Sequence, residues 1–175
     1  INGIFYIPTS PFIKSEILQP HKIHLILAKF GSLKACQVLE KNLSEKMIDQ
    51  KKKNLFKLST YRNQNNKTAV NFFKKTLNYY LKKDFKIPLT NKIFKILFDN
   101  SEKKIAKDFY MDEKKIRVMV KNGMVIGSHS ATHPLMSDMS KVETDNEIKK
   151  SFDYIGQFYK NRTYCHPYGG FKSFN

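Results

Sequence analysis

The sequence has 175 residues, 41% of them hydrophobic and 27% charged, which is enough apolar material for a folded core and excludes a disordered chain. Lys and Arg number 32 against 15 Asp and Glu, a formal net charge of +17 that by itself points to an anionic partner such as nucleic acid, a membrane surface or an acidic glycan. Arginine occurs only three times, so the side chain favoured for bidentate phosphate and base contacts is scarce, and we expect no nucleic-acid partner.

The cysteines and the apolar runs set two further limits. Cys36 and Cys165 are too few and too far apart for a disulfide framework. The cysteines therefore do not indicate whether the protein works in an oxidising or a reducing compartment. The longest apolar run, residues 23–30, is shorter than the roughly 18 to 20 residues that span a bilayer, and we expect no transmembrane segment. The chain starts at Ile1 and stops at Asn175 without a final element, so we interpret it as a fragment and assign no localisation.

The first predicted element is a strand. Residues 4–7 are rich in β-branched and aromatic side chains and are followed by the turn formers Pro8, Ser10 and Pro11. We predict a buried strand over residues 4–7.

From about residue 22 to residue 110 the pattern is helical. Apolar residues recur at spacings of three and four in two places, the second after a helix start predicted at Thr90: Phe73, Leu77, Tyr80 and Leu81, then Ile93, Ile96 and Leu97. Residues 59–68, STYRNQNNKT, have no apolar period and many turn formers, so we predict an exposed loop there.

After this block the chain alternates between helix and strand. A short helix is predicted to begin at Asp112 and to stop at Gly123, with Ile116, Met119 and Val120 on one face. A buried strand over residues 124–129 and a helix over residues 142–158 follow. The second helix has one apolar face of Ile148, Phe152, Ile155 and Tyr159. This order predicts the α/β fold class.

Two histidines, His129 and His133, stand at the end of the second predicted strand. Two imidazoles with three residues between them can reach one metal ion, and imidazole suits zinc and neighbouring divalent ions. The spacing alone also occurs by chance in loops. The position at a strand end favours a site, and Pro134 prevents a regular helix from running straight on from His133.

The stretch NGMVIGSHSATHPLMSDMS resembles the second conserved motif of the polysaccharide deacetylases, carbohydrate esterase family four. That motif reads G-x-x-I-G-x-H followed by [ST]-x-x-H-P-x-L, matched here by Gly123, Ile126, Gly127, His129, Ser130, His133, Pro134 and Leu135. EIKKSFDYIGQF resembles the helix after that motif, YCHPYGGF the third motif, and INGIFYIPTSP the second strand of the family.

The resemblance implies a fold. It indicates a partial, irregular (β/α) barrel of the polysaccharide deacetylase type, formed by residues 1–12 and 109–175. Residues 13–108 are then a helical insertion, far longer than the family's usual connection, about which the resemblance says nothing.

The resemblance also implies a metal site. His129 and His133 are expected to bind a divalent metal, usually zinc, with an aspartate as third ligand. In the family that aspartate and the aspartate that acts as general base lie in a T-F-D-D-G motif, expected upstream of Ile1, and the general-acid histidine is expected beyond Asn175. Asp99 in LFDNSE resembles the T-F-D-D-G motif only superficially and is assigned no role.

The third motif implies an oxyanion donor. The family's tyrosine maps to Tyr168, whose backbone N–H is expected to bind the oxyanion, with Pro167 and Gly169 setting the turn. Cys165 stands where the family often has an arginine that steadies the base. His166 is expected in the wall of the substrate groove rather than in the chemistry.

The function implied is metal-dependent hydrolysis of N-acetyl or O-acetyl groups on a sugar or polysaccharide, with an N-acetylated carbohydrate as substrate. Without the aspartate motif, the fragment alone is expected to be inactive. Two alternatives stay open: a non-catalytic carbohydrate-binding relative with the same fold, and a basic helical nucleic-acid-binding protein, which a salt-dependent binding titration would test.

Overall fold

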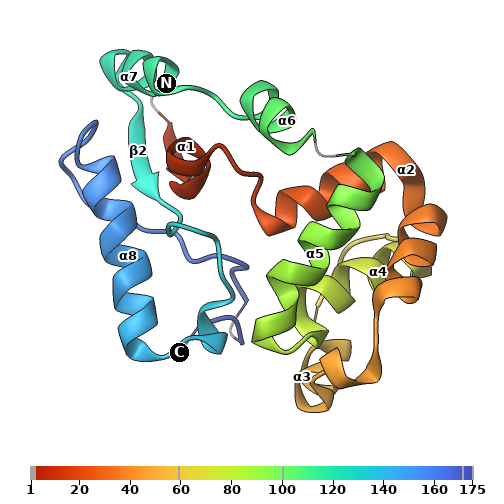
Figure 1. The fold of residues 1–175 in the computed structure, drawn as a ribbon. Helices are drawn as coiled ribbons and strands as arrows, with labels where there is room; N and C mark the ends of the chain where they lie inside the picture. Colours follow the sequence, from red (N-terminus) through yellow and green to blue (C-terminus); the bar gives the residue numbers. More distant parts are fainter. Residues whose placement is uncertain (1–2, 59, 100, 171, 175) are drawn as a thin grey trace. The chain divides into compact units, whose positions relative to one another are not determined.

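The computed structural model describes residues 3–58, 60–99, 101–170 and 172–174 (Figure 1). They form two compact units. The α/β unit combines Ile1–Leu18 with Glu102–Asn175, and the helical unit is Gln19–Ser101. The helical insertion predicted from sequence, residues 13–108, overlaps the helical unit and has wider bounds at both ends.

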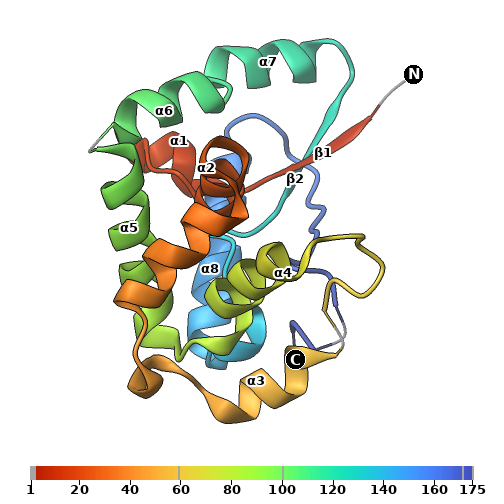
Figure 2. The ribbon, with the colours of Figure 1, turned by 90° about the vertical axis from the view of Figure 1, so that its right-hand side faces the viewer.

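The α/β unit contains a short parallel sheet. Strand β1 (Ile4–Ile7) pairs in parallel with β2 (Val125–Ser128), with Ile7 opposite Ser128, and the two strands lie side by side in Figure 2. An isolated parallel bridge between Ser128 and Tyr164 adds a third segment on the other side of β2. Both predicted strands are therefore confirmed. The described strands show an α/β arrangement and no closed barrel.

The predicted burial of β1 is wrong. Ile4, Phe5 and Tyr6 are 55%, 43% and 37% exposed, and only Ile7 is buried. The reason is position: within the described residues β1 pairs with a neighbour on one side only, so it is an edge strand. β2 lies between β1 and the segment around Tyr164, and its last three residues are buried.

The helical elements of the α/β unit are α1 (Ser10–Lys14), α6 (Glu102–Phe109), α7 (Glu113–Lys121), the 3-10 turn η3 (Met136–Asp138) and α8 (Lys141–Ile155). Of these, α7 and α8 pack against β2. The predicted start of α7 is confirmed: the carboxylate of Asp112 accepts a hydrogen bond from the backbone N–H of Lys115. Gly123, at φ = 79°, follows the helix end as predicted.

The core of the α/β unit joins these elements. Ser140 and Glu143 form a capping box that starts α8, close to the predicted residue 142. The buried cluster consists of Ile7, Ile116, Ile126, Tyr154 and Ile155, with Met119, Val120, Phe158 and Tyr159 packed against it. The predicted apolar faces of α7 and of the end of α8 thus meet on β1 and β2.

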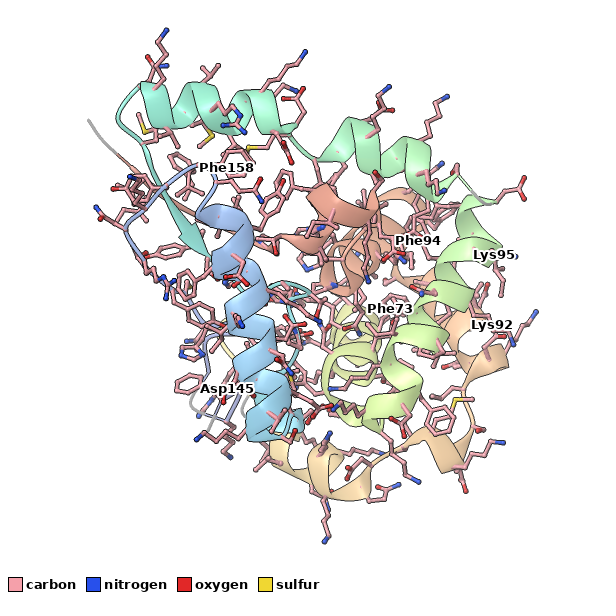
Figure 3. The ribbon with its side chains drawn as sticks, turned by 60° about the vertical axis from the view of Figure 1, so that its left-hand side comes forward. Phe73, Lys92, Phe94, Lys95, Asp145 and Phe158 are labelled. Atoms are coloured by element: carbon pink, nitrogen blue, oxygen red, sulfur yellow. The ribbon has the colours of Figure 1, made fainter. Side chains whose placement is uncertain are left out.

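The helical unit confirms the predicted helical block. It contains α2 (Gln19–Asn42), the 3-10 turn η1 (Glu45–Met47), α3 (Gln50–Lys57), α4 (Thr68–Lys75), the π-helical turn η2 (Thr76–Tyr80) and α5 (Lys83–Phe98). Phe73, Leu77, Leu81 and Phe94 are almost completely buried, and Figure 3 shows Phe73 and Phe94 within this unit. None of the helices in the described residues has the length and apolarity needed to cross a bilayer.

The predicted start of α5 at Thr90 is wrong. The helix begins at Lys83 and contains Pro88, although proline cannot donate a backbone hydrogen bond inside a helix. The Thr90 hydroxyl instead donates to the carbonyl of Lys86, one turn back, as threonine does inside a helix. Ile96, predicted on the apolar face, is 52% exposed.

Gly127→Ala is expected to destabilise the α/β unit. A Cβ atom at Gly127 would lie 2.6 Å from two ring atoms of Tyr6 and 2.8 Å from Oγ1 of Thr163. Overpacking of this kind typically costs about 1–3 kcal/mol, so thermal unfolding followed by circular dichroism should show Tm lowered by several degrees. The Tyr6→Ala, Gly127→Ala double variant should lose less stability than the two single variants added together. An unchanged Tm for Gly127→Ala would contradict the clash.

Candidate functional site

The two histidines of the motif lie together at the carboxyl edge of the sheet. His129 follows the last residue of β2, and its backbone N–H donates to the carbonyl of Ile7 at the end of β1 (3.1 Å). His133 returns in the loop, with its ring centroid 4.7 Å from that of His129 and the two rings at 74°. The two rings therefore lie next to each other at the end of β2. Metal binding by them stays a prediction.

A backbone carbonyl holds the ring of His129. Nδ1 of His129 lies 2.8 Å from the carbonyl oxygen of Cys165. Because a carbonyl oxygen can only accept, Nδ1 carries the proton, and in the neutral ring Nε2 keeps its lone pair. Metal-binding histidines are commonly oriented in this way. His129 therefore has the tautomer of a ligand that binds through Nε2.

The loop that carries His133 has an unusual backbone. Ser130 and His133 both have positive φ, 64° and 57°. The Oγ of Ser130 accepts from the backbone N–H of His133 at 3.0 Å and so closes the loop on itself. Non-glycine residues at positive φ persist only where their surroundings hold them, and they cluster at functional sites.

Glu147 of α8 anchors this loop. Oε2 accepts from the backbone N–H groups of Ala131 and Thr132, both at 2.9 Å, and Oε1 accepts from the Thr132 hydroxyl at 2.6 Å. Carboxylate hydrogen bonds are stronger than neutral ones. Glu147 thus binds three donors of the loop between the two histidines.

Three serines form a buried support below the loop. Ser128, Ser130 and Ser151 are fully buried. The hydroxyls of Ser128 and Ser151 are 2.6 Å apart, Ser151 also donates to the carbonyl of Ile148, and the backbone N–H of Ser130 donates to Oγ of Ser128. The network connects the end of β2 to α8. The hydroxyls of Ser130 and Thr132 both support the loop.

The third motif lies beside β2. The backbone N–H of Cys165 donates to the carbonyl of Ser128, and the N–H of Ser128 donates to the carbonyl of Thr163, both at 2.9 Å. These bonds place the Cys165 carbonyl against His129. Burial raises the pKa of Tyr164 to about 12, with the negative charge of Glu147 adding to the shift, so this phenol stays protonated at neutral pH.

The predicted oxyanion turn follows. Tyr168 has φ = 65°, and its ring centroid lies 5.1 Å from that of His133. Pro167 is buried. A Cβ atom at Gly169 would have no atom within 4 Å, so a side chain would fit there, and it is the positive φ of 62° that favours glycine at this position. His166 is exposed and packs between Tyr164 and Phe174, with ring centroids at 4.9 and 4.5 Å.

Two other observations concern a third metal ligand. In the part of the chain that the structure describes, no group of three His, Cys, Asp or Glu side chains is arranged to hold a metal ion. Asp99 caps the carboxyl end of α5 with φ = 47° and belongs to the helical unit.

Sequence reasoning missed Glu147. A signal was present: Glu147 and Ser151 are four residues apart on a predicted helix, so they lie on one face, next to the apolar Ile148 and Ile155. Two polar residues so placed indicate a polar contact beyond the helix. In the structure Glu147 contacts the loop between His129 and His133, and Ser151 contacts Ser128 at the end of β2.

Comparison with known families agrees with the family resemblance of the motifs. Residues 63–173, 111 of the 175, match the family model described as Polysaccharide deacetylase. The chain belongs to the polysaccharide deacetylase family, deacetylase-type hydrolases that act on carbohydrates. No curated protein and no solved structure matches it significantly. The matched residues include α4 and α5, which the motif resemblance did not cover, and leave out β1.

Proposed function

We propose that the protein is a metal-dependent hydrolase that removes N-acetyl or O-acetyl groups from a sugar or polysaccharide. The observation that carries this proposal is the histidine pair: His129, held with Nε2 available by the Cys165 carbonyl, stands next to His133 at the edge where parallel strands end. A partial, irregular (β/α) barrel is the fold that we propose for the matched domain.

His129 and His133 fit a divalent metal, and zinc is the ion that we propose. Imidazole nitrogen is a favoured zinc ligand, and the carbonyl on Nδ1 of His129 is the partner that a ligand histidine usually has. When bound, such an ion polarises an acetyl carbonyl and lowers the pKa of a water molecule. The third ligand and the general base are proposed to be aspartates of the family's T-F-D-D-G motif, which these 175 residues do not contain.

The other residues of the site position the reacting groups. Glu147 and the buried serines hold the loop, so His133 keeps its place relative to His129. The backbone N–H of Tyr168 is proposed to donate to the oxyanion that forms at the acetyl carbonyl oxygen, as a preorganised donor of the kind that contributes strongly to catalysis. Pro167 and Gly169 shape that turn, and His166 is proposed to line the substrate groove.

A non-catalytic carbohydrate-binding relative is the second candidate. It is favoured by one observation, that the described residues offer two clustered histidines and no third acidic ligand with them. An Asp-Asp pair at the end of a strand in the parent protein would favour the enzyme. A parent protein without that pair would favour the binding protein.

Loss of either histidine is expected to abolish most zinc binding. Titration calorimetry with zinc should give one site per chain for residues 1–175. His129→Ala and His133→Ala should each weaken binding by more than the about 10- to 100-fold that loss of a supporting partner typically costs. His24→Ala is the matched control because His24 is exposed on α2 in the helical unit. Equal zinc affinity in the wild type and in all three variants would contradict the proposed metal site.

A further inference from the structure

The positive charge of the protein is concentrated in the helical unit. Gln19–Ser101 contains 18 Lys and Arg against 5 Asp and Glu, a net charge of +13 out of the +17 of the whole chain. The α/β unit has 14 against 10, a net charge of +4. Many of these lysines are simply exposed, such as Lys92 and Lys95 on α5 (Figure 3). Charge alone therefore indicates no particular site.

One cavity of the helical unit is lined by three positively charged side chains. It has a volume of about 460 Å³ and lies between the end of α3, the loop after it and α4. Lys57, Arg62 and Lys75 line it together with the polar side chains of Tyr61, Gln64 and Asn71. None of the described residues that line it is acidic, so the three positive charges have no carboxylate in the wall to balance them.

The wall of this cavity is built by specific contacts. Nζ of Lys75 donates to the carbonyl of Lys57 at 2.7 Å and joins α4 to the end of α3. Tyr61 has φ = 56°, its hydroxyl accepts from Nδ2 of Asn78 at 2.8 Å, and Nζ of Lys74 lies 4.2 Å from its ring centroid. A tyrosine held at positive φ is a strained position of the kind found at binding sites.

Nζ of Lys74 also fixes the loop. It donates to Oε1 of Gln64 at 2.8 Å while the Lys74 side chain is 9% exposed. Burial lowers the pKa of Lys74. Lys57, Arg62 and Lys75 line one cavity, and because like charges repel, their positive charges favour the entry of an anion.

We propose that this cavity binds a phosphate monoester. Arg62 provides a planar fork that matches a phosphate bidentately, and Lys57 and Lys75 add point charges. Three cations suit a doubly charged phosphate better than a singly charged carboxylate. The volume exceeds that of a phosphate group and leaves room for the group that bears it. The proposal is independent of the metal site, because it concerns only residues of the helical unit.

The test is calorimetry on the full 175-residue chain at fixed ionic strength. Inorganic phosphate, glucose 6-phosphate and glucuronate are titrated in turn. We expect saturable 1:1 binding of both phosphates and weaker binding of glucuronate. Arg62→Gln should weaken phosphate binding about 10- to 100-fold, the range for loss of a hydrogen bond to a charged group. Lys57→Gln should also weaken it.

Lys53→Gln is the control. It removes the same charge from an exposed position of α3 that does not line the cavity, and it should leave phosphate affinity within about twofold at this ionic strength. Unchanged circular dichroism spectra and Tm show that each variant is folded. The proposal is overturned by the absence of phosphate binding to the wild type, by glucuronate binding as tightly as glucose 6-phosphate, or by equal losses in Arg62→Gln and Lys53→Gln.

Discussion

Residues 1–175 alone are expected to release no measurable acetate from acetylated chito-oligosaccharides, even with zinc added. His129 and His133 are the two metal ligands that we propose, but the 175 residues contain no T-F-D-D-G motif, and the resemblance assigns the role of general acid to none of their histidines. Each missing proton-transfer group typically lowers the rate about 10²- to 10⁴-fold, so loss of both leaves almost nothing. Acetate release is measured by a coupled enzymatic assay over several hours.

The matched experiment uses a longer polypeptide in which this sequence is joined to a T-F-D-D-G motif and to the family's general-acid motif. It should be active, and His129→Ala should abolish that activity while His24→Ala leaves it unchanged. Inactivity of the longer protein on both N-acetylated and O-acetylated sugars would contradict the proposed function. If the short chain turns over substrate and His129→Ala stops it, another residue takes the proton, and His166→Ala and Asp99→Asn then show which.

Glu147→Ala is expected to weaken zinc binding although Glu147 lies outside the histidine pair. The substitution leaves the backbone N–H groups of Ala131 and Thr132 and the Thr132 hydroxyl without the carboxylate that they bind. Loss of a supporting partner typically lowers metal affinity about 10- to 100-fold. Loss of hydrogen bonds to a charged group should also reduce the free energy of unfolding by about 2 kcal/mol. Calorimetry with zinc and urea unfolding measure the two effects.

Two variants of α8 control for general effects. Asp153→Asn removes a negative charge from an exposed position of the same helix and should leave both quantities nearly unchanged. Glu147→Gln keeps one acceptor oxygen. Its zinc affinity and its free energy of unfolding should both lie between those of the wild type and those of Glu147→Ala. A Glu147→Ala protein that is less stable but binds zinc as tightly as the wild type would show that the anchor serves the fold and not the site.

The sequence by itself determined α7 and β2 of the α/β unit. Asp112 and Gly123 bound α7 because capping and helix termination depend on neighbouring residues. The position of β2 and the placement of His129 at its end were equally local, and the motif at residues 123–135 was sufficient to indicate the family. The apolar spacing around Phe73 and Leu77 correctly predicted buried helical positions.

The tertiary structure decided what depends on distant neighbours. The exposure of Ile4 and Phe5 follows from which strands pair with β1, and the early start of α5 follows from packing that overrides the unfavourable Pro88. The tautomer of His129 depends on a carbonyl 36 residues further along the chain, and the shape of the loop depends on Glu147. Hydrogen bonds between residues far apart in the chain leave no periodic pattern in the sequence, so only the folded arrangement reveals them.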